Sequence, residues 1–311
     1  MIITADAIDG LKTLKNGTID TCITSPPYFG LRDYGVSGQI GIEDTPEEYI
    51  DKLVSVFREV KRVLCDDGTL WVNIGDSYAG GSGRWEKEKN ISSMQATNKG
   101  SYGQFGVAKK WKHETIKSKD LIGIPWLLAF ALRNDGWYLR SDIIWNKPNA
   151  MPESITDRCT KSHEYIFLLS KSRKYYYDNE AIKEPAVSTD NSKRNRDETR
   201  LNNVPGRKRM TGLIENNYIM RNKRDVWTVA TQPYKGAHFA VFPSKLIEPC
   251  ILAGSRTGGI VLDPFCGSGT TGVVALEHGR EFIGIDLNPD YCEIANKRLS
   301  KESEGEHDES R

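Results

Sequence analysis

The sequence predicts an α/β fold built on a doubly wound, Rossmann-like sheet, because short apolar runs alternate with amphipathic stretches along most of the chain. A second observation is a glycine-rich turn at residues 263–269, which follows an apolar run and precedes a helical stretch. A third is Asp286, a carboxylate at the end of the next apolar run. With 311 residues, the chain is also long enough to bury a large core.

The first part of the chain begins this alternation. Residues 20–24 (DTCIT) predict a strand that must end at Ser25-Pro26-Pro27, because proline lacks the amide proton that a paired strand donates. Residues 46–64 place apolar side chains three and four positions apart and predict an amphipathic helix. Thr45 is the expected N-cap and Pro46 the first helical residue.

The remaining elements continue the alternation. After an expected turn at 66–68, the predicted strands are 69–74, 139–145, 163–169, 259–262 and 282–285. The predicted helices are 125–134, 270–278 and 291–299. This order supports a single sheet with helices packed on both of its faces.

Two polar segments interrupt the alternation. Residues 79–119 are rich in Gly, Ser, Asn and Lys, and residues 183–235 contain twelve Lys or Arg against six Asp or Glu. Charge alone favours a solvated loop, but the aromatic residues between these basic side chains favour a surface that contacts nucleic acid. We therefore expect a catalytic part formed by 1–182 and 236–299. The tail 300–311 is acidic, contains no apolar residue and is expected to be disordered.

Composition limits the functions that the chain can have. The 43 Lys and Arg nearly balance the 42 Asp and Glu, so net charge does not indicate a polyanionic partner. No apolar run reaches the roughly 20 residues of a membrane span, and the first residues do not resemble a secretion signal. The six cysteines form no Cys-x-x-Cys pair and no zinc-type cluster. We therefore expect an unexported, cytoplasmic protein with reduced thiols and no bound metal.

The stretch Asp263-Pro264-Phe265-Cys266-Gly267-Ser268-Gly269 is a candidate binding loop. Without Cβ atoms at Gly267 and Gly269, the backbone can turn sharply and approach a ligand closely. Asp286 follows Gly267 by 19 residues and could accept hydrogen bonds from both hydroxyls of a ribose, which indicates an adenosine-containing ligand. The loop also matches the G-x-G-x-x-G fingerprint, so an NAD-dependent dehydrogenase is an alternative on this segment alone.

The stretch Ser25-Pro26-Pro27-Tyr28 follows a different predicted strand. Neither proline has an amide proton, so we expect the carbonyl oxygens of this stiff loop to be free acceptors. The exocyclic amine of a nucleobase is a poor nucleophile because its lone pair is delocalised into the ring. If a main-chain carbonyl and a side-chain oxygen each accept one amine proton, the nitrogen becomes more tetrahedral and its lone pair becomes available. The Tyr28 ring could stack on a base taken out of the duplex, a contact worth about 1–3 kcal/mol. A plain proline turn is the alternative if the motif stands alone.

Taken together, Ser25-Pro26-Pro27-Tyr28 and Phe265-Cys266-Gly267-Ser268-Gly269 resemble two motifs of the S-adenosylmethionine-dependent DNA amino-methyltransferases. Their order, with the proline motif first, resembles the β arrangement of that family. The resemblance extends over nearly the whole catalytic fold and is weakest in 79–119 and 183–235. It implies a methyltransferase sheet with a target-recognition insert at 183–235 and a second variable loop at 79–119.

The resemblance also implies roles for individual residues. The target base would be held by Ser25, Pro26, Pro27 and Tyr28. The cofactor S-adenosylmethionine would be bound by Asp6, Phe239, Pro243, Asp263, Phe265, Cys266, Gly267, Ser268, Gly269 and Asp286. Double-stranded DNA would be contacted by Arg194, Arg196, Arg207, Lys208, Arg209, Lys223 and Arg224. The implied setting is a bacterial or phage enzyme, monomer or dimer, which a cognate restriction endonuclease could accompany.

Several of these residues have simpler alternatives. Asp6 could cap a helix, and residues 73–78 could line the base pocket or form a strand-end turn. His163 and Glu164 resemble an acid and a base, but a hydrogen-bonded pair at a strand edge explains them better. The ammonium formed by amine methylation loses its proton readily, so the reaction needs no strong base before transfer.

The implied reaction is direct methyl transfer to an exocyclic amine, without a covalent enzyme intermediate. In the family, serine at the first motif position is most often associated with cytosine N4 and aspartate with adenine N6. Ser25 therefore favours N4-cytosine, with N6-adenine as the alternative. Methylation at cytosine C5 would need a cysteine nucleophile, and Pro249-Cys250 lies in a predicted helix. Protein glutamine and RNA methyltransferases use a related motif after the cofactor loop, whereas Ser25 precedes Phe265 by 240 residues.

Overall fold

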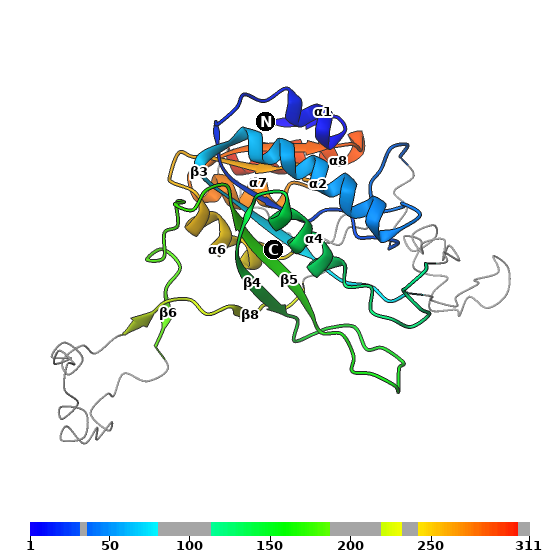
Figure 1. The fold of residues 1–311 in the computed structure, drawn as a ribbon. Helices are drawn as coiled ribbons and strands as arrows, with labels where there is room; N and C mark the ends of the chain where they lie inside the picture. The colour runs from blue at the N-terminus through cyan, green and yellow to red at the C-terminus, as the bar shows by residue number, and fades with distance from the viewer. Residues whose placement is uncertain (32–35, 80–112, 187–218, 232–241, 304–311) are drawn as a thin grey trace, which may run out of the picture. The chain divides into compact units, whose positions relative to one another are not determined.

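The computed structural model describes residues 1–31, 36–79, 113–186, 219–231 and 242–303 (Figure 1). The chain divides into two compact units, a larger one formed by Met1–Asp178 and Asp225–Arg311 and a smaller one formed by Asn179–Arg224. The smaller unit begins before the expected insert 183–235 and ends before residue 235. Residues 226–228 belong to the larger unit because they form a strand of its sheet.

The larger unit contains an eight-stranded sheet. Its strands lie in the order β1 (Ile2–Thr4), β10 (Glu281–Asp286), β9 (Ile260–Asp263), β2 (Ile19–Thr24), β3 (Leu64–Ile74), β5 (His163–Ser170), β4 (Tyr138–Asn146) and β8 (Val226–Thr228). Strand β5 is antiparallel to both of its neighbours, β3 and β4, and the other pairs are parallel. Apart from the turn expected at 66–68, the predicted strands are confirmed.

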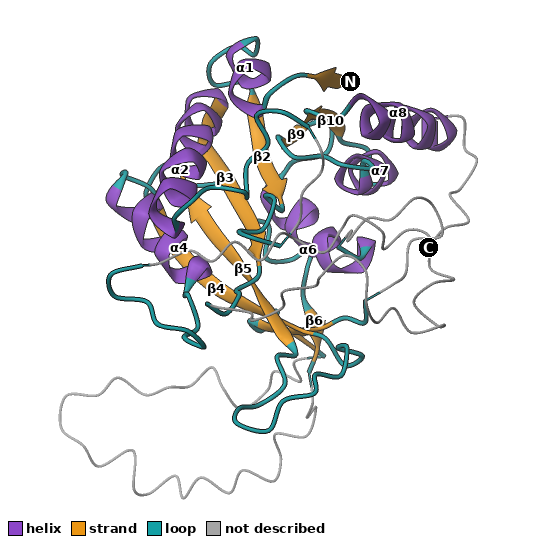
Figure 2. Cartoon of the chain, turned by 90° about the vertical axis from the view of Figure 1, so that its right-hand side faces the viewer, coloured by secondary structure: helices purple, strands orange, loops and turns teal. Residues whose placement is uncertain are grey.

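Helices cover both faces of this sheet, as the doubly wound prediction requires (Figure 2). One face carries α1 (Ala7–Lys12), α2 (Pro46–Val63) and α4 (Ile124–Asn134), which contact one another in that order. The other face carries α6 (Ser244–Gly254), α7 (Thr270–Glu277) and α8 (Pro289–Ser303). Among the described residues, no helix is long and apolar enough to cross a membrane.

Helix α2 forms where the apolar spacing and the cap predict it. The Thr45 hydroxyl accepts a hydrogen bond from the Glu48 amide at 3.2 Å, which satisfies one of the free amides of the first turn. Pro46 occupies the first helical position, where no amide proton is needed. The apolar side of the helix is buried and includes Leu53 and Phe57, both fully inaccessible to solvent.

Strand β2 lies inside the sheet, between β9 and β3, and positions the site. It pairs with β3 on one side and with β9 on the other, in the register Thr21↔Val261 and Cys22↔Leu262. Strand β10 pairs with β9 in turn, so the carboxyl ends of three parallel strands meet at one edge of the sheet. In open α/β sheets this edge is the usual place of ligand binding.

Two expectations about element ends are wrong. Strand β3 begins at Leu64, so residues 66–68 lie within the strand, where the ladder with β2 shifts its register. Helix α8 continues to Ser303, four residues into the tail that was expected to be disordered. The Ser300 hydroxyl donates to the Asn296 carbonyl at 3.0 Å, and Leu299 is buried, so the last turns remain attached to the core. The tail residues 304–311 lie outside the described residues.

The cysteines form no disulfide, since all six are free. Four of them are buried and Cys159 is exposed. Within the described ranges, no three His, Cys, Asp or Glu side chains are grouped so that they could hold a metal ion.

Candidate functional site

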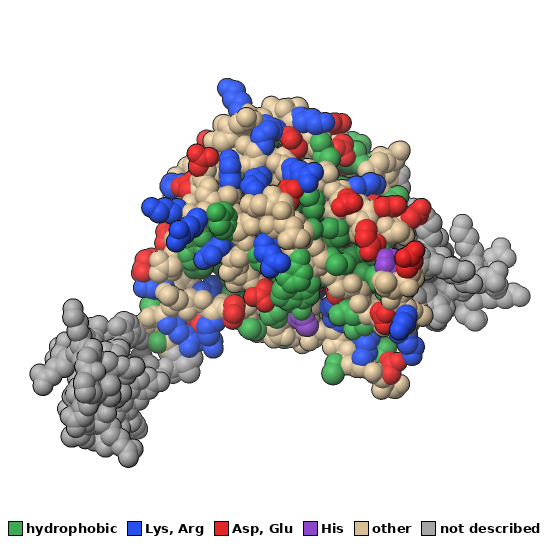
Figure 3. All heavy atoms as spheres, in the orientation of Figure 1, with side chains coloured by type: hydrophobic (Ala, Val, Ile, Leu, Met, Phe, Trp, Pro, Cys, Tyr) green, Lys and Arg blue, Asp and Glu red, His purple; other side chains and the backbone are tan. Residues whose placement is uncertain are grey.

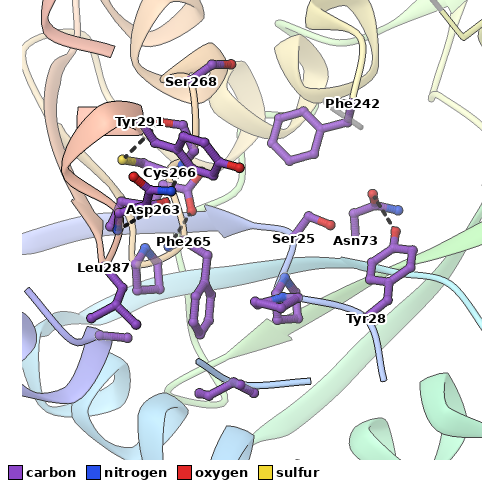
Figure 4. Close-up of a pocket in the computed structure, with 18 of the residues that line it drawn as sticks. Ser25, Tyr28, Asn73, Phe242, Asp263, Phe265, Cys266, Ser268, Leu287 and Tyr291 are labelled. Atoms are coloured by element: carbon purple, nitrogen blue, oxygen red, sulfur yellow. Dashed lines mark hydrogen bonds between the residues drawn. The ribbon is translucent and has the colours of Figure 1, made fainter. Parts of the chain in front are cut away.

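The two sequence motifs meet in one cavity of about 400 Å³ at the carboxyl ends of β2, β9 and β10 (Figure 4). Figure 4 shows Ser25 between the glycine loop on one side and Tyr28 and Asn73 on the other. The residues predicted for this site that line the cavity are Asp6, Ser25, Pro26, Pro27, Tyr28, Asp263, Phe265, Cys266, Gly267, Ser268 and Asp286. Ser25 and Phe265, 240 residues apart in the sequence, thus reach the same space.

The glycine loop has the geometry that its sequence predicts. Gly267 and Gly269 have φ angles of 50° and 80°, in the left-handed region that favours glycine. A Cβ atom at Gly269 would lie 3.0 Å from the Cβ atom of Ala295 in α8, so the turn also needs glycine for packing. A Cβ atom at Gly267 would meet no protein atom within 4 Å. Because Gly267 lines the cavity, the space in front of this turn is open to a ligand.

Asp263 connects the loop to its surroundings. Its side chain is buried, with an exposed fraction of 2% for the residue, and its carboxylate accepts hydrogen bonds from the hydroxyls of Thr24 at 2.6 Å and Thr271 at 2.7 Å. The Phe265 amide also donates to it, at 3.1 Å. Burial raises the pKa of Asp263 to about 6, although these hydrogen bonds act in the opposite direction. The Asp263 carboxylate therefore has its partners inside the protein and supports the shape of the loop.

Asp286 ends β10 beside the glycine turn. One carboxylate oxygen accepts from the Gly267 amide at 2.8 Å and the other from the Asn288 amide at 2.9 Å. Burial raises the pKa of this carboxyl group. The following residues Leu287, Asn288 and Tyr291 line the same cavity and were not predicted. Their position directly after Asp286 was the available signal, because residues that follow a strand end lie at the same edge of the sheet.

Four predicted cofactor residues remain to be described. Gly269 shapes the glycine turn but is not among the cavity residues. Asp6 lines the cavity and also caps α1, because its carboxylate accepts from the Ile8 amide at 2.9 Å. Asp6 can therefore cap α1 and line the cavity at the same time, so the two alternatives for this residue do not exclude each other. Phe239 lies outside the described residues, and Pro243 precedes α6 without being among the cavity residues. Phe242 lines the cavity instead.

The proline loop differs from expectation at one carbonyl. The hydroxyl of Tyr49, a fully buried residue of α2, donates a hydrogen bond to the Pro27 carbonyl at 2.7 Å. The Pro27 oxygen is thus not a free acceptor, and the expectation that both proline carbonyls are free is wrong for this one. Ser25 and Pro26 both line the cavity, so the Pro26 carbonyl and the Ser25 hydroxyl, which also interacts with the side chain of Tyr28, are candidate acceptors for a ligand.

A polar cluster formed by Tyr28, Asn73, Lys147 and Glu164 lines the part of the cavity away from the glycine loop. Oε2 of Glu164 accepts from the Tyr28 hydroxyl at 2.7 Å and from the Asn73 amide group at 3.2 Å. Its Oε1 accepts a hydrogen bond from the Lys147 ammonium group. Burial, and then the carboxylate of Glu164, raise the pKa of Tyr28 well above its ordinary value.

The expected pairing of His163 with Glu164 is wrong. Neighbouring strand residues point to opposite faces of the sheet, so Glu164 faces the cavity and His163 does not. The His163 ring instead lies 3.4 Å from the Tyr165 hydroxyl. Burial, and then the charge of Lys161, lower the pKa of His163.

Most of the predicted DNA-contacting residues fall outside the described part of the chain: Arg194, Arg196, Arg207, Lys208 and Arg209. Lys223 and Arg224 are described, and both belong to the smaller unit. Arg224 donates a hydrogen bond to Glu184 at 2.7 Å and remains largely exposed. The face drawn in Figure 3 carries both basic and acidic side chains.

Comparison with known proteins identifies clear relatives. The N6/N4 methyltransferase family model, described as DNA methylase, matches residues 19–297. Type II methyltransferase M.SmaI of Serratia marcescens is 51% identical over 298 residues, which cover 96% of this chain and 90% of the relative. Type II methyltransferase M.Cfr9I of Citrobacter freundii is 48% identical over 297 residues, covering 96% and 86%.

Solved structures share the fold. PvuII DNA methyltransferase, described as cytosine-N4-specific, has a TM-score of 0.61 at 18% identity and covers 97% of this chain and 89% of that chain. A putative DNA modification methylase of Thermus thermophilus, in complex with S-adenosyl-L-methionine, has a TM-score of 0.58 at 23% identity, covering 98% and 96%. These likenesses confirm the α/β sheet fold.

Proposed function

Because this chain belongs to the N6/N4 family of S-adenosylmethionine-dependent DNA methyltransferases, we propose that it methylates the exocyclic N4 amine of cytosine in duplex DNA. Membership in this family of Type II enzymes rules out the dehydrogenase alternative raised by the glycine fingerprint. The residue that carries the cytosine proposal is Ser25. It lines the cavity between the glycine loop and Tyr28, at the motif position where the family most often has serine for N4-cytosine.

The cofactor half of the site fits S-adenosylmethionine, which supplies an electrophilic methyl group when bound. Asp286 offers a carboxylate for the ribose hydroxyls, and the open space in front of Gly267 admits the ligand close to the backbone. Phe265 and Ser268 line this half as well. These positions support the assignment of Phe265, Gly267, Ser268 and Asp286 to cofactor binding.

The base half of the site prepares the amine. The Ser25 hydroxyl and the Pro26 carbonyl would each accept one amine proton, which favours a pyramidal nitrogen with an available lone pair. The Tyr28 ring offers a face for stacking, and its hydroxyl is anchored on Glu164, so the ring has a fixed orientation. Extruding a base from the duplex costs a few kcal/mol, and this stacking offsets part of that cost.

The Glu164 carboxylate lines the cavity, but hydrogen-bond donors of the protein already hold it. Glu164 accepts three hydrogen bonds, from Tyr28, Asn73 and Lys147. This agrees with a reaction in which the methylated amine, once positively charged, loses its proton without a strong base. We therefore assign Glu164 to positioning.

The segments 79–119 and 183–235 are proposed to recognise the DNA target, and a cognate restriction endonuclease is proposed as a partner in the same system. If basic side chains of 183–235 contact phosphates, DNA affinity should fall steeply as the salt concentration rises. A flat salt response would count against this role. The site of action would be the bacterial cytoplasm, where the DNA substrate lies.

The experiment that tests the proposal combines the purified protein with unmethylated duplex DNA and isotopically labelled S-adenosylmethionine. The DNA is then digested to nucleosides and analysed by mass spectrometry, and the modified sites are mapped by sequencing. Labelled N4-methylcytosine is the expected product. Labelled N6-methyladenine would keep the enzyme class and overturn the base assignment.

A further inference from the structure

The ammonium group of Lys147 lies at the cavity with hydrogen-bonding capacity to spare. Its side chain is only 19% exposed, it pairs with Glu164, and it lies 4.2 Å from the ring centroid of Trp145. An ammonium group has three protons to donate. Within the described residues, Glu164 is its one hydrogen-bond acceptor, so two protons remain for a ligand.

The cost of burying this charge is reduced by its surroundings. Glu164, with a side chain 15% exposed, neutralises Lys147, and the Trp145 face provides a cation–π contact. Glu164 is itself held by Tyr28 and Asn73. The lysine is thus fixed relative to the same tyrosine that is proposed to stack on the target base.

A fixed donor next to the proposed base site distinguishes cytosine from adenine. Next to its amine, the Watson–Crick edge of cytosine carries two acceptors, the ring nitrogen N3 and the 2-oxygen, whereas adenine carries N1 and then a C–H group. The Ser25 and Pro26 oxygens are acceptors and therefore suit the amine. The ring nitrogen and the 2-oxygen of cytosine are acceptors themselves, so they need hydrogen-bond donors from the protein. Lys147 is a charged donor that lines the cavity and is linked to Tyr28 through Glu164.

We infer that Lys147 is a specificity-determining residue that donates a hydrogen bond to the 2-oxygen of the target cytosine, while Glu164 holds it in place. The inference rests on the proposed N4-cytosine function and adds to it the contact that selects the base. A base lacking an acceptor at that position would leave the buried ammonium group without its second partner, which is unfavourable.

The test is a cycle of two proteins and two substrates. Wild type and Lys147→Met are assayed on duplexes containing the mapped methylation site, with either cytosine or a carbon-linked 2-aminopyridine at the target position. This analogue keeps the amine and the ring nitrogen and lacks the 2-oxygen. Lys161→Met is the matched control, because Lys161 is similarly buried, with a side chain 18% exposed, lies 4.0 Å from Asp76 and is not among the cavity residues.

We expect Lys147→Met to lower kcat/KM about 10- to 100-fold on the cytosine duplex and less than about 3-fold on the analogue duplex, as for the loss of one hydrogen bond to a charged group. Lys161→Met should change both values equally or not at all. An equal loss for Lys147→Met on both duplexes, or no loss on cytosine, overturns the inference, since a structural role would not depend on the 2-oxygen.

Two further measurements keep the inference testable. Where turnover on the analogue is too slow, equilibrium binding of the two duplexes with S-adenosylhomocysteine present gives the same comparison. If Lys147→Met does not fold, Lys147→Gln, which keeps an uncharged donor, should show a smaller loss confined to the cytosine duplex. If the wild type produces N4-methylcytosine and Lys147→Met loses equal activity on both duplexes, only the role of Lys147 is contradicted. If the wild type produces N6-methyladenine, the proposed function is contradicted as well.

Discussion

The hydroxyl of Thr24 donates a 2.6 Å hydrogen bond to the carboxylate of Asp263, although the two residues are 239 positions apart. Thr24 ends β2 directly before the proline loop, and Asp263 ends β9 directly before the glycine loop. The contact is buried and joins the half of the site assigned to the base to the half assigned to the cofactor. It therefore connects the two loops between which a methyl group would be transferred.

Replacing Thr24 by valine removes this bond and keeps the side-chain volume. We expect Thr24→Val to lower the free energy of unfolding by about 1.5–3 kcal/mol, because a buried carboxylate loses a donor. Cofactor affinity should fall as well, since the glycine loop begins at that carboxylate. Urea unfolding and calorimetric titration with S-adenosylmethionine measure both effects. Thr24→Ser keeps the hydroxyl and should remain close to wild type; equal losses for serine and valine would show that the hydrogen bond is not the cause.

Asp263 should also make stability depend on pH. Its pKa is about 6 in the folded protein against an ordinary value of 3.8, so between these values the folded state binds more protons than the unfolded state. The contribution of the Asp263 carboxyl group to the free energy of unfolding is therefore fully present below pH ~4 and is lost as the pH rises through about 6. Asp263→Asn cannot ionise. Wild type should lose up to about 3 kcal/mol relative to this variant between pH 4 and 8, measured by urea unfolding. A difference that does not change with pH would contradict the raised pKa.

Local signals predicted most of the fold because the strands are apolar runs and the helices bury apolar residues at helical spacing. Helix α2 shows this best, since the Thr45 cap and the three- and four-residue spacing lie in one stretch. Strand β8 was not predicted because its three residues, Val226–Thr228, lie in a polar segment and are stabilised by pairing with distant Trp145 and Asn146. Pairing of this kind has no local pattern.

The two halves of the site were predicted from motifs, but their connections were not. Glu164 and Tyr28 are 136 residues apart, and Lys147 reaches Glu164 because β4 and β5 are antiparallel neighbours. Register between strands determines these contacts, and one residue of slip would turn Glu164 to the opposite face. Sequence alone shows which residues are polar at a strand end, without showing which of them meet.

The two loops should separate chemistry from cofactor binding when they are mutated. Ser25→Ala removes a proposed amine acceptor and should lower kcat at least about 100-fold, while the affinity for S-adenosylmethionine remains close to wild type. Gly267→Val should do the reverse and abolish cofactor binding, because its branched side chain fills the open space and opposes a φ of 50°. Single-turnover kinetics and calorimetry distinguish the effects. Loss of cofactor affinity in Ser25→Ala would contradict its assignment to the base.

Tyr49 should act as a positioning residue for the proline loop. Its hydroxyl holds the Pro27 carbonyl at 2.7 Å, and its ring packs against Phe29 with centroids 5.5 Å apart. Tyr49→Phe keeps this packing and removes only the hydrogen bond, which we expect to lower the free energy of unfolding by about 0.5–1.5 kcal/mol.

The loss of this bond should affect catalysis more than binding. The freed loop would hold the Ser25 and Pro26 oxygens less accurately around the amine, so kcat should fall several-fold while KM for DNA and cofactor affinity change little. Tyr175→Phe is the matched control, because its hydroxyl accepts from Arg140 at 3.2 Å and it is not among the cavity residues. If both variants lose stability and only Tyr49→Phe loses kcat, the hydrogen bond positions the loop; equal kcat in the two variants would assign Tyr49 to stability alone.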